Sequence, residues 1–426
     1  MAQAPGHRNV SFISYCPHKA AGSGDRTEGL TRIKRAAGIS HRKRGTGRRA
    51  GWIIILTGAL LVLGIDHGDP FATHHPATAG TFARPRSQAQ AQAQARVPPD
   101  GFTAAAAAAV AHLQTKYSGA YTATHLWQAA SALSATIGFM QASGSRAYLS
   151  DLTNTYLAHH YAGNFLDHYY DDEGWWVLTW VKAYQLTGRK AYLAEAKLIF
   201  ADMARGWNPV CGGGIPWRKN RPYKNAITNE EFLGAAILLH DLTPGDTYYS
   251  GWALQEWQWF SSTGMLTRHH LVIDGLRQCK PKLHSPTWTY NQGMLIGDLV
   301  GLSRLTGQNS LLKTAEQIAH AVMHSPRLSP GGILQEPCTP LVSCGRDRPM
   351  FKGIFMQNLR LLYARVPRPA YQAYLRNNAI AVWTWDRSGD VYGVSWSGPF
   401  EAPSMTAQSS ALDLFTTQID PARRGP

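Results

Sequence analysis

The sequence predicts an all-α domain built from paired helices. From residue 102 to about residue 416, apolar residues recur at intervals of three and four, and alternating β-branched runs are few. The chain also repeats itself, because residues 174–203 can be laid over residues 293–322 at a constant offset of 119. Each copy predicts a helix, a Thr-Gly stop and a second helix. Paired helices that repeat around a domain indicate a solenoid or a closed toroid.

The apolar period places the individual helices in chain order. We expect helices at 103–116, 124–141, 146–161, 174–187, 190–205, 228–241, 247–260, 291–306, 309–324, 352–364 and 368–385. Thr228 and Glu231 have the spacing of a capping box, which would start the helix at 228–241. The repeat offset also sets residues 171–173 over residues 290–292, so two inner helices should present polar residues at their entrance.

The residues before the helical region divide into three segments of different composition. The first 50 residues carry 11 Lys and Arg against 2 acids and show no clear periodicity. Residues 51–65 are uncharged and follow Arg48-Arg49, which is the shape of an export signal, although a spanning helix needs about 20 residues. A Gln-Ala alternation then marks a linker that cannot bury a core. We therefore expect a basic, disordered extension (1–50), a signal peptide or uncleaved signal anchor (51–79), a low-complexity linker (80–100), the helical domain (101–416) and a tail (417–426).

The charge distribution and the cysteines indicate which classes of partner and which cellular compartment to expect. The net charge of +15 is concentrated in the first 50 residues, and the helical region shows no arginine-rich helix or zinc-finger spacing, so nucleic-acid binding is not expected. Cys338 and Cys344 lie six apart in a loop, a spacing that permits a disulfide in an oxidising compartment. Cys211 and Cys279 could pair or stay free. An extracytoplasmic protein, secreted or tethered through residues 51–65, fits these features.

Asp171 and Asp172 are adjacent acids among large aromatic residues. Neighbouring carboxylates repel and apolar surroundings disfavour charge, so one of the two should keep its proton to an unusually high pH. One ionised and one protonated carboxyl is the equipment of glycoside hydrolysis. Side chains that diverge from a turn reach the roughly 5–5.5 Å separation of a retaining enzyme more readily than the wider inverting one. The alternatives are helix N-capping, because the pair directly precedes a predicted helix, and a calcium site, whose usual spacing is absent.

Two further segments carry polar and aromatic residues suited to a sugar. A glycine-rich turn at 211–216 leads to Trp217, and it lacks the Gly-Lys-Ser/Thr of a phosphate-binding loop. Asn225, Asn229 and Glu230 follow, and amides and acids beside aromatic rings bind sugar hydroxyls. The 14 Trp and 18 Tyr of the chain also provide flat apolar faces for sugar rings, although core packing is the default role of any one of them.

Taken together, several motifs resemble glycoside hydrolase family 76, the endo-α-1,6-mannanases. They are Tyr-Asp-Asp-Glu-Gly-Trp-Trp at 170–176, Cys-Gly-Gly-Gly-Ile-Pro-Trp at 211–217, Lys-Asn-Ala-Ile-Thr-Asn-Glu at 224–230, Thr-Tyr-Asn-Gln-Gly at 289–293 and Phe-Lys-Gly-Ile-Phe at 351–355. The resemblance implies an (α/α)6 toroid of inner and outer helices with the site at one end.

The resemblance also implies roles for residues. Asp171 matches the nucleophile and Asp172 the general acid and base. Residues 336–338 and Cys344 look like the family's loop before Phe351, which favours the Cys338–Cys344 disulfide. The sequence departs from the family pattern at 129–131, after Trp127-Gln128. The expected substrate-binding residues are Trp127, Gln128, Trp175, Trp217, Asn225, Asn229, Glu230, Tyr290, Asn291, Gln292 and Lys352, the last being equally suited to a structural cation.

The resulting hypothesis is a retaining hydrolase of α-1,6-linked mannan. We expect a monomer that needs neither a cofactor nor a metal. Two alternatives stay open at this stage. One is a transglycosylase that uses the same site to move mannan chains onto another glycan, and the other is a non-catalytic glycan-binding protein on the same fold.

Overall fold

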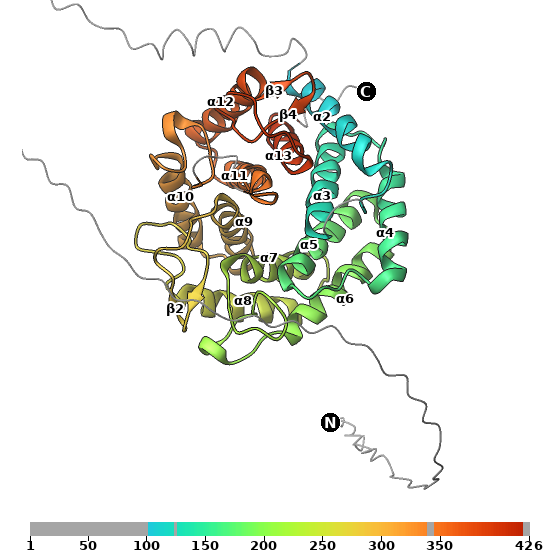
Figure 1. Ribbon diagram of the computed structural model, residues 1–426. Coiled ribbons are helices and arrows are strands. Elements are labelled where there is room, and N and C mark those ends of the chain that lie inside the picture. The colour runs from blue at the N-terminus through green and yellow to red at the C-terminus, as the bar shows by residue number, and fades with distance from the viewer. Residues whose placement is uncertain (1–100, 123–125, 339–344, 421–426) are drawn as a thin grey trace, which may run out of the picture. The chain divides into compact units, whose positions relative to one another are not determined.

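The computed structural model describes residues 101–122, 126–338 and 345–420 of the chain (Figure 1). The predicted extension, signal segment and linker lie outside the described residues, as does Cys344. No helix among the described residues has both the length and the apolar character needed to cross a membrane. The stretch at 51–65, which we predicted as signal or anchor, is not among them.

The described residues form twelve α-helices. The first six are α2 (Phe102–Tyr117), α3 (Leu126–Ser143), α4 (Leu149–Gly163), α5 (Tyr170–Thr187), α6 (Lys190–Arg205) and α7 (Ala226–Asp241). The other six are α8 (Tyr248–Ser262), α9 (Thr289–Thr306), α10 (Asn309–Met323), α11 (Phe351–Arg365), α12 (Pro369–Trp385) and α13 (Met405–Thr416). Short 3₁₀ turns are η1 (Val210–Gly212), η2 (Pro330–Gly332) and η4 (Arg348–Met350).

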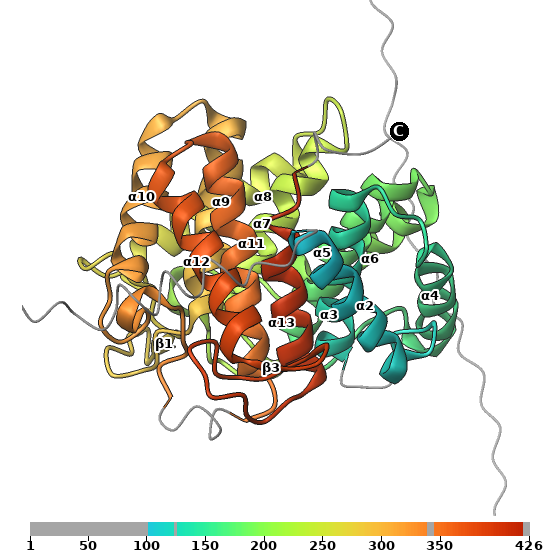
Figure 2. The same cartoon turned by 90° about the horizontal axis from the view of Figure 1, so that it is seen from above.

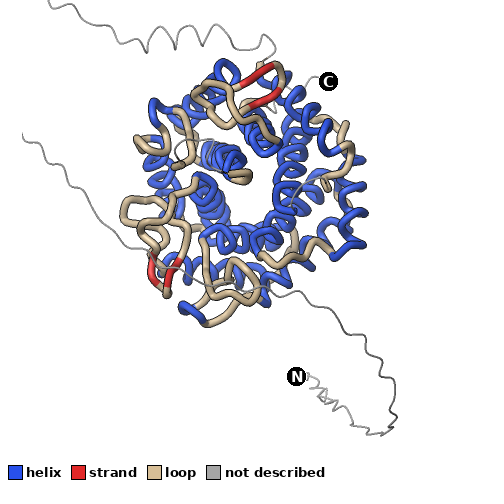
Figure 3. The backbone as a smooth tube through the Cα atoms, viewed as in Figure 1, coloured by secondary structure: helices blue, strands red, loops and turns tan. Residues whose placement is uncertain are grey.

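Strands contribute little to the described part of the chain (Figure 3). One antiparallel hairpin pairs β1 (Leu276–Arg277) with β2 (Lys280–Pro281), and Leu276 lies opposite Pro281. The other pairs β3 (Arg387–Ser388) with β4 (Val391–Tyr392), and Arg387 lies opposite Tyr392. Both hairpins lie in connections between helices, so the all-α prediction is confirmed.

The helices form two concentric rings (Figure 1), and Figure 2 shows the same helices after a turn of 90°. The inner ring consists of α3, α5, α7, α9, α11 and α13, each packed against the next. The ring is closed because α13, the last inner helix, packs against α3. The other six helices lie outside it, and each of α5, α7 and α9 packs against the outer helix that follows it in the chain. This arrangement is an (α/α)6 toroid, as predicted.

The internal repeat is confirmed to the residue. Helices α5 and α9 begin at residues 170 and 289 and end at residues 187 and 306, which is the offset of 119 found in the sequence. The glycine that follows each helix, Gly188 or Gly307, has a left-handed φ of 70° or 72°. A left-handed glycine is the usual way to end a helix, because a side chain would be strained there.

Several predicted helix starts were wrong by two to four residues. Helix α5 begins at Tyr170, so Asp171 and Asp172 lie in its first turn and neither is its N-cap. Helix α7 begins at Ala226, which places Thr228 inside the helix and removes the predicted capping box. Inner helices are buried on nearly every side, so their apolar pattern carries no boundary signal and the polar entrance residues were read as lying outside the helix.

Helix α13 was not predicted at all. Its sequence is rich in Ser, Thr and Gln, which are mediocre helix formers, yet Gln408, Ser409 and Ser410 are completely buried. The small side chain of Ser410 lets α11 approach closely, since a Cβ added to Gly353 would lie 2.7 Å from the Ser410 Cα. Helix α13 is therefore held by close contact with α11 and lacks the apolar stripe from which helices are predicted.

Polar side chains at the fourth position of four inner helices hold the loops at one end of the ring. Oε1 of Glu173 accepts a hydrogen bond from the Asp167 N–H at 2.9 Å, and Oε1 of Gln292 accepts one from the Val272 N–H at 2.8 Å. In α7 and α13 the same position binds the Ile215 and Tyr392 N–H groups through Asn229 and Gln408. Buried backbone groups need such partners, so these side chains fix the loops that build the site.

Candidate active site

Four aromatic side chains from the starts of α3, α5, α9 and α11 meet at one end of the ring. The ring of Trp127 lies 6.1 Å from that of Trp175 and 6.1 Å from that of Phe351, measured between centroids. Tyr290 stacks on Phe351 at 3.7 Å. We call these four residues the aromatic cluster. Trp127 and Tyr290 remain partly exposed, so the cluster offers flat apolar surface on which a sugar ring could stack.

Asp171 lies beside this cluster and is held through Trp217. The Trp217 indole Nε1–H donates to Oδ2 of Asp171 at 2.8 Å. The Trp217 backbone carbonyl in turn accepts the N–H of Tyr170 at 3.0 Å, which ties the loop to the first turn of α5. The other oxygen of Asp171, Oδ1, is buried without a hydrogen-bond partner among the described residues. One oxygen is therefore oriented by the protein and the other is left available.

Burial and charge separate the two carboxyls of the pair. Burial raises the pKa of Asp171 to about 7, while the Trp217 hydrogen bond and backbone N–H groups of the helix start act against it. Burial and the negative charges of Asp171, Asp167 and Asp347 raise the pKa of Asp172 to about 8. The Trp217 hydrogen bond favours the ionised form of Asp171, and the neighbouring negative charges favour the protonated form of Asp172.

Asp167 and Asp347 are brought to the pair from two different loops. Oδ1 of Asp347 accepts a hydrogen bond from Gln128 Nε2 at 2.6 Å, which connects α3 with the segment before η4. Oδ1 of Asp167 accepts the Tyr169 N–H at 3.0 Å. No cation is paired with either aspartate of the catalytic candidate pair within the described part of the chain. The surroundings of Asp172 are thus negatively charged, which favours its protonated form.

Several polar atoms of the inner helices are buried without a hydrogen-bond partner among the described residues. Both oxygens of Glu231 are buried and unpaired, and a Cβ added to Gly174 of α5 would lie 2.3 Å from its Oε2. Both amide atoms of Asn291 and the hydroxyl of Ser131 are also unpaired among the described residues. Buried polar groups without partners are costly, so these atoms are suited to bind the hydroxyl groups of a ligand. Glu231 can sit there because position 174 is a glycine.

Glu173 does not join the pair, although it directly follows it. Its Oε1 accepts Lys219 Nζ at 2.5 Å, and Lys219 also binds Oδ2 of Asp202 at 2.5 Å. Burial raises the pKa of Glu173, while the Lys219 ion pair lowers it. The side chain thus points to the outer layer and stabilises the loop before α5.

The predicted substrate-binding residues fall into two groups. Those of the first group lie at the site end of the ring, where Gln128 is bonded to Asp347 and the others are exposed, packed in the aromatic cluster or carry unpaired polar atoms: Trp127, Gln128, Trp175, Trp217, Asn225, Tyr290 and Asn291. Trp217 is the most open of them, with 38% of its surface exposed.

The residues of the second group are almost completely buried, and three of the four bind backbone carbonyl or N–H groups. Asn229 and Gln292 spend their amides on loop backbone. Lys352 donates to the Val394 carbonyl at 3.0 Å and lies over the Trp396 ring, so it behaves as the structural cation considered from sequence. Glu230 is completely buried, with both oxygens unpaired. Asn229 and Gln292 thereby hold loops at the site end of the ring.

Sequence reasoning missed several residues at the site. Asp167 and Asp347 act on Asp172 through charge, and Phe351 and Trp288 extend the aromatic surface. Asp167 could have been suspected from its position four residues before Asp171. Asp347 carries no such signal, since only the closure of the ring brings it to α3, 219 residues from its partner Gln128.

The described cysteines take part in disulfides, and the described residues contain no metal-binding cluster. Cys211 and Cys279, left undecided from sequence, form a disulfide with a Cα–Cα distance of 4.8 Å. Cys338 takes part in a disulfide, and Cys344, its predicted partner, lies outside the described residues. Within the described ranges, no group of three or more His, Cys, Asp or Glu side chains is placed to hold a metal ion.

The sequence is similar to those of two yeast mannosidases. The chain is 28% identical over 243 residues to mannan endo-1,6-alpha-mannosidase DCW1 of Saccharomyces cerevisiae, covering 53% of each chain. It is 26% identical over 214 residues to DFG5 of the same yeast, covering 46% of each. The chain thus spans about half the length of the curated relatives it matches.

Solved structures share the fold. The α-1,6-mannanase of Salegentibacter sp. HEL1_6 superposes with a TM-score of 0.67 at 22% identity, covering 74% of this chain and 98% of that one. Dfg5 from Chaetomium thermophilum in complex with glucosamine gives 0.68 at 17% identity, covering 77% and 92%. The sequence profile of glycosyl hydrolase family 76 matches residues 103–425. The chain therefore belongs to glycosyl hydrolase family 76.

Proposed function

We propose that this chain is a retaining glycoside hydrolase that cleaves α-1,6-mannosidic linkages in mannan. The observation that carries the proposal is the pair of adjacent aspartates in the first turn of α5. Asp171 receives a hydrogen bond from Trp217, which favours its carboxylate form, while Asp172 is surrounded by negative charge, which favours its protonated form. An ionised and a protonated carboxyl at one site are what double displacement at a glycosidic bond requires.

In the first step, the carboxylate of Asp171 attacks the anomeric carbon. The bond from that carbon to the glycosidic oxygen breaks as Asp172 donates its proton to the leaving oxygen, and the sugar is left as an ester on Asp171. In the second step, Asp172 takes a proton from water, whose oxygen attacks the anomeric carbon and releases Asp171. The indole N–H of Trp217 balances charge on Asp171 in both steps.

The choice of an α-1,6-mannan as substrate is supported by the relatives. The yeast proteins are mannan endo-1,6-alpha-mannosidases. An inactive variant of the Salegentibacter mannanase, with two adjacent aspartates changed to asparagine, forms a complex with α-1,6-mannotriose. The aromatic cluster suits such a chain, because stacked rings bind the apolar faces of successive sugars.

We also infer that the folded domain works outside the cytoplasm as a monomer. The Cys211–Cys279 disulfide supports an oxidising compartment, since such bridges are rare in the cytosol. Release of the domain from cells into the medium, or its retention with membranes, would distinguish secretion from anchoring through residues 51–65. Size-exclusion chromatography with light scattering tests the monomer.

The proposed activity is tested by digestion of linear α-1,6-mannan with the purified chain. We expect shortened oligosaccharides whose new reducing ends appear first in the α configuration by proton NMR. First release of the β anomer would contradict the retaining mechanism. Products extended by an added acceptor glycan would instead identify a transglycosylase, and binding without any product would identify a glycan-binding protein.

A further inference from the structure

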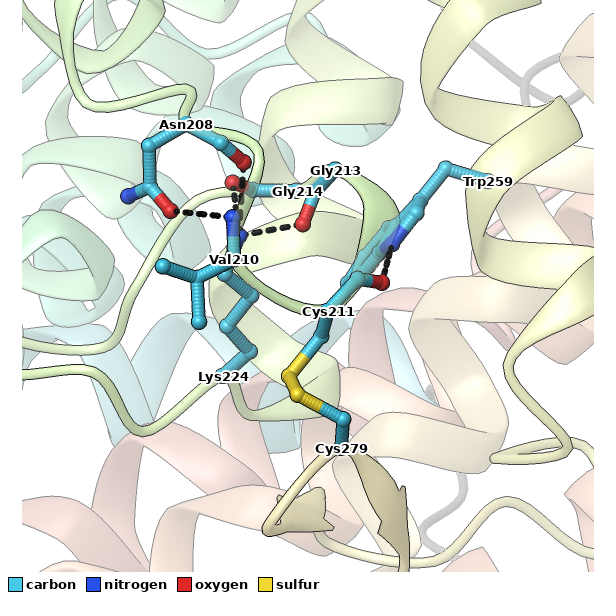
Figure 4. Close-up of a disulfide and its surroundings, with 8 residues drawn as sticks. All are labelled: Asn208, Val210, Cys211, Gly213, Gly214, Lys224, Trp259 and Cys279. Carbon is cyan, nitrogen blue, oxygen red and sulfur yellow. Dashed lines mark hydrogen bonds between the residues drawn. A yellow bond between two sulfur atoms is a disulfide. The ribbon is translucent and has the colours of Figure 1, made fainter.

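Lys224 is a buried cation outside the aspartate pair with an unusual set of partners. Its Nζ donates to the carbonyl of Asn208 at 3.0 Å, to that of Gly214 at 2.7 Å and to that of Gly213 (Figure 4). The side chain is 0% exposed, so water does not replace any of these bonds. An ammonium has three N–H donors, and all three are used on one loop.

The same loop is fastened by a disulfide and by close packing. The Cys211–Cys279 bridge joins it to the β1–β2 hairpin, 68 residues later in the chain. The Trp259 Nε1–H donates to the Cys211 carbonyl at 3.0 Å. Gly213 and Gly214 have positive φ and lie against Trp259, where a Cβ would come within 2.7 or 2.3 Å of the ring. Bare backbone here lets the carbonyls turn toward Lys224.

This loop ends at Trp217, the residue that donates a hydrogen bond to Asp171. Trp217 donates its backbone N–H to the Tyr223 carbonyl at 2.8 Å, directly before Lys224. Its indole then reaches Oδ2 of Asp171 at 2.8 Å. The position of that indole therefore depends on how the preceding backbone is held.

We propose that Lys224 is a positioning residue, whose ammonium, together with the Cys211–Cys279 disulfide, holds residues 208–217 so that the Trp217 indole stays on Asp171. This inference rests on the proposed function. It assigns a role at the site to Lys224 and the disulfide, which lie outside the Asp171–Asp172 pair.

The charges around Lys224 agree with this role. Glu256 of α8 is the acid that faces it, and it is completely buried with both oxygens unpaired. Burial lowers the pKa of Lys224 to about 8, and Glu256 opposes that change. Only the charged ammonium can serve three carbonyls at once, because a neutral amine has two N–H groups.

The test measures the pKa of Asp171 in the full chain without substrate. Carbon-13 NMR follows its carboxyl through a pH titration, with Asp171→Asn identifying the signal. Lys224→Met should loosen the loop and raise this pKa by about one to two pH units, the effect of losing one hydrogen bond to a charged group. Trp217→Phe removes the indole donor directly and should raise it equally. Lys313→Met, at an exposed position of α10, is the matched control and should change nothing.

The double variant decides whether Lys224 acts through Trp217. Combining Lys224→Met with Trp217→Phe should give no further rise, since both remove the same hydrogen bond. Additive rises, or an unchanged Asp171 in folded Lys224→Met, would overturn the proposal. Should Lys224→Met not fold, Lys224→Gln, with two donors in place of three, should show a smaller rise. Absence of mannan hydrolysis would refute the proposed function and leave this titration intact.

Discussion

Gly293→Ala is expected to destabilise the ring at the contact between α9 and α11. A Cβ at this position would lie 2.5 Å from the Phe355 Cα and 3.0 Å from its backbone nitrogen. These atoms belong to the backbone of a neighbouring helix and cannot rotate away, so the two helices must separate. Such overpacking costs about 1–3 kcal/mol. Alanine recovers about 0.5–1 kcal/mol over glycine in a helix, so the midpoints of the two ranges leave a net loss of about 1 kcal/mol.

Gly251→Ala in α8 is the matched control. Gly251 is exposed, and its Cβ would meet no atom within 4 Å. The same substitution should therefore stabilise the protein by about 0.5–1 kcal/mol. Urea unfolding followed by tryptophan fluorescence and circular dichroism gives the midpoint for each variant. A Gly293→Ala midpoint equal to or above that of the unchanged chain would refute the close approach of α9 and α11.

Replacing Cys211 and Cys279 by serine should lower the free energy of unfolding by about 4 kcal/mol, because the bridge closes a loop between residues 68 apart. Equal melting temperatures would contradict this. Asp347→Asn removes a negative charge that faces Asp172, so the pKa of Asp172 should fall and the alkaline limb of kcat/KM should move to lower pH. A limb that stays in place would exclude the charge effect. Burial raises the pKa of Glu230 well above 4.5, so folding takes up a proton and stability is lost as pH rises above that value. Glu230→Gln should leave the urea midpoint unchanged near pH 4 and raise it at pH 8. Equal midpoints for the variant and the unchanged chain at pH 8 would show that the Glu230 carboxyl does not destabilise the fold there.

The helix bounds are predicted well from the sequence where one face of the helix is exposed to solvent. The outer helix α6 was predicted with the bounds that the structure has, and α10 to within one residue, because one face of each is exposed. Inner helices lack that contrast, which explains the late starts assigned to α5 and α9 and the failure to predict α13. Glycines and serines at helix contacts replaced the apolar stripe.

The site was predictable in its chemistry and much less so in its connections. The aspartate pair stood out because two adjacent acids lie among aromatic residues. The hydrogen bond from Trp217 to Asp171 spans 46 residues, and it depends on a loop whose carbonyls are gathered by Lys224. No local pattern reports such a contact. Gln292 and Asn229 were predicted to bind a ligand because of their residue type. In the structure their side-chain amides form hydrogen bonds with the backbone of neighbouring loops.

The most direct test of the account is the turnover of linear α-1,6-mannan by Asp171→Asn and Asp172→Asn. Each isosteric change removes an ionisable carboxyl from the pair, so each should lower kcat by about a thousandfold or more while circular dichroism stays unchanged. Asp241→Asn, at the far end of α7 in an exposed ion pair with Arg304, is the control and should keep full activity. Full activity in either pair variant would contradict the assignment of Asp171 and Asp172 as the catalytic carboxyls.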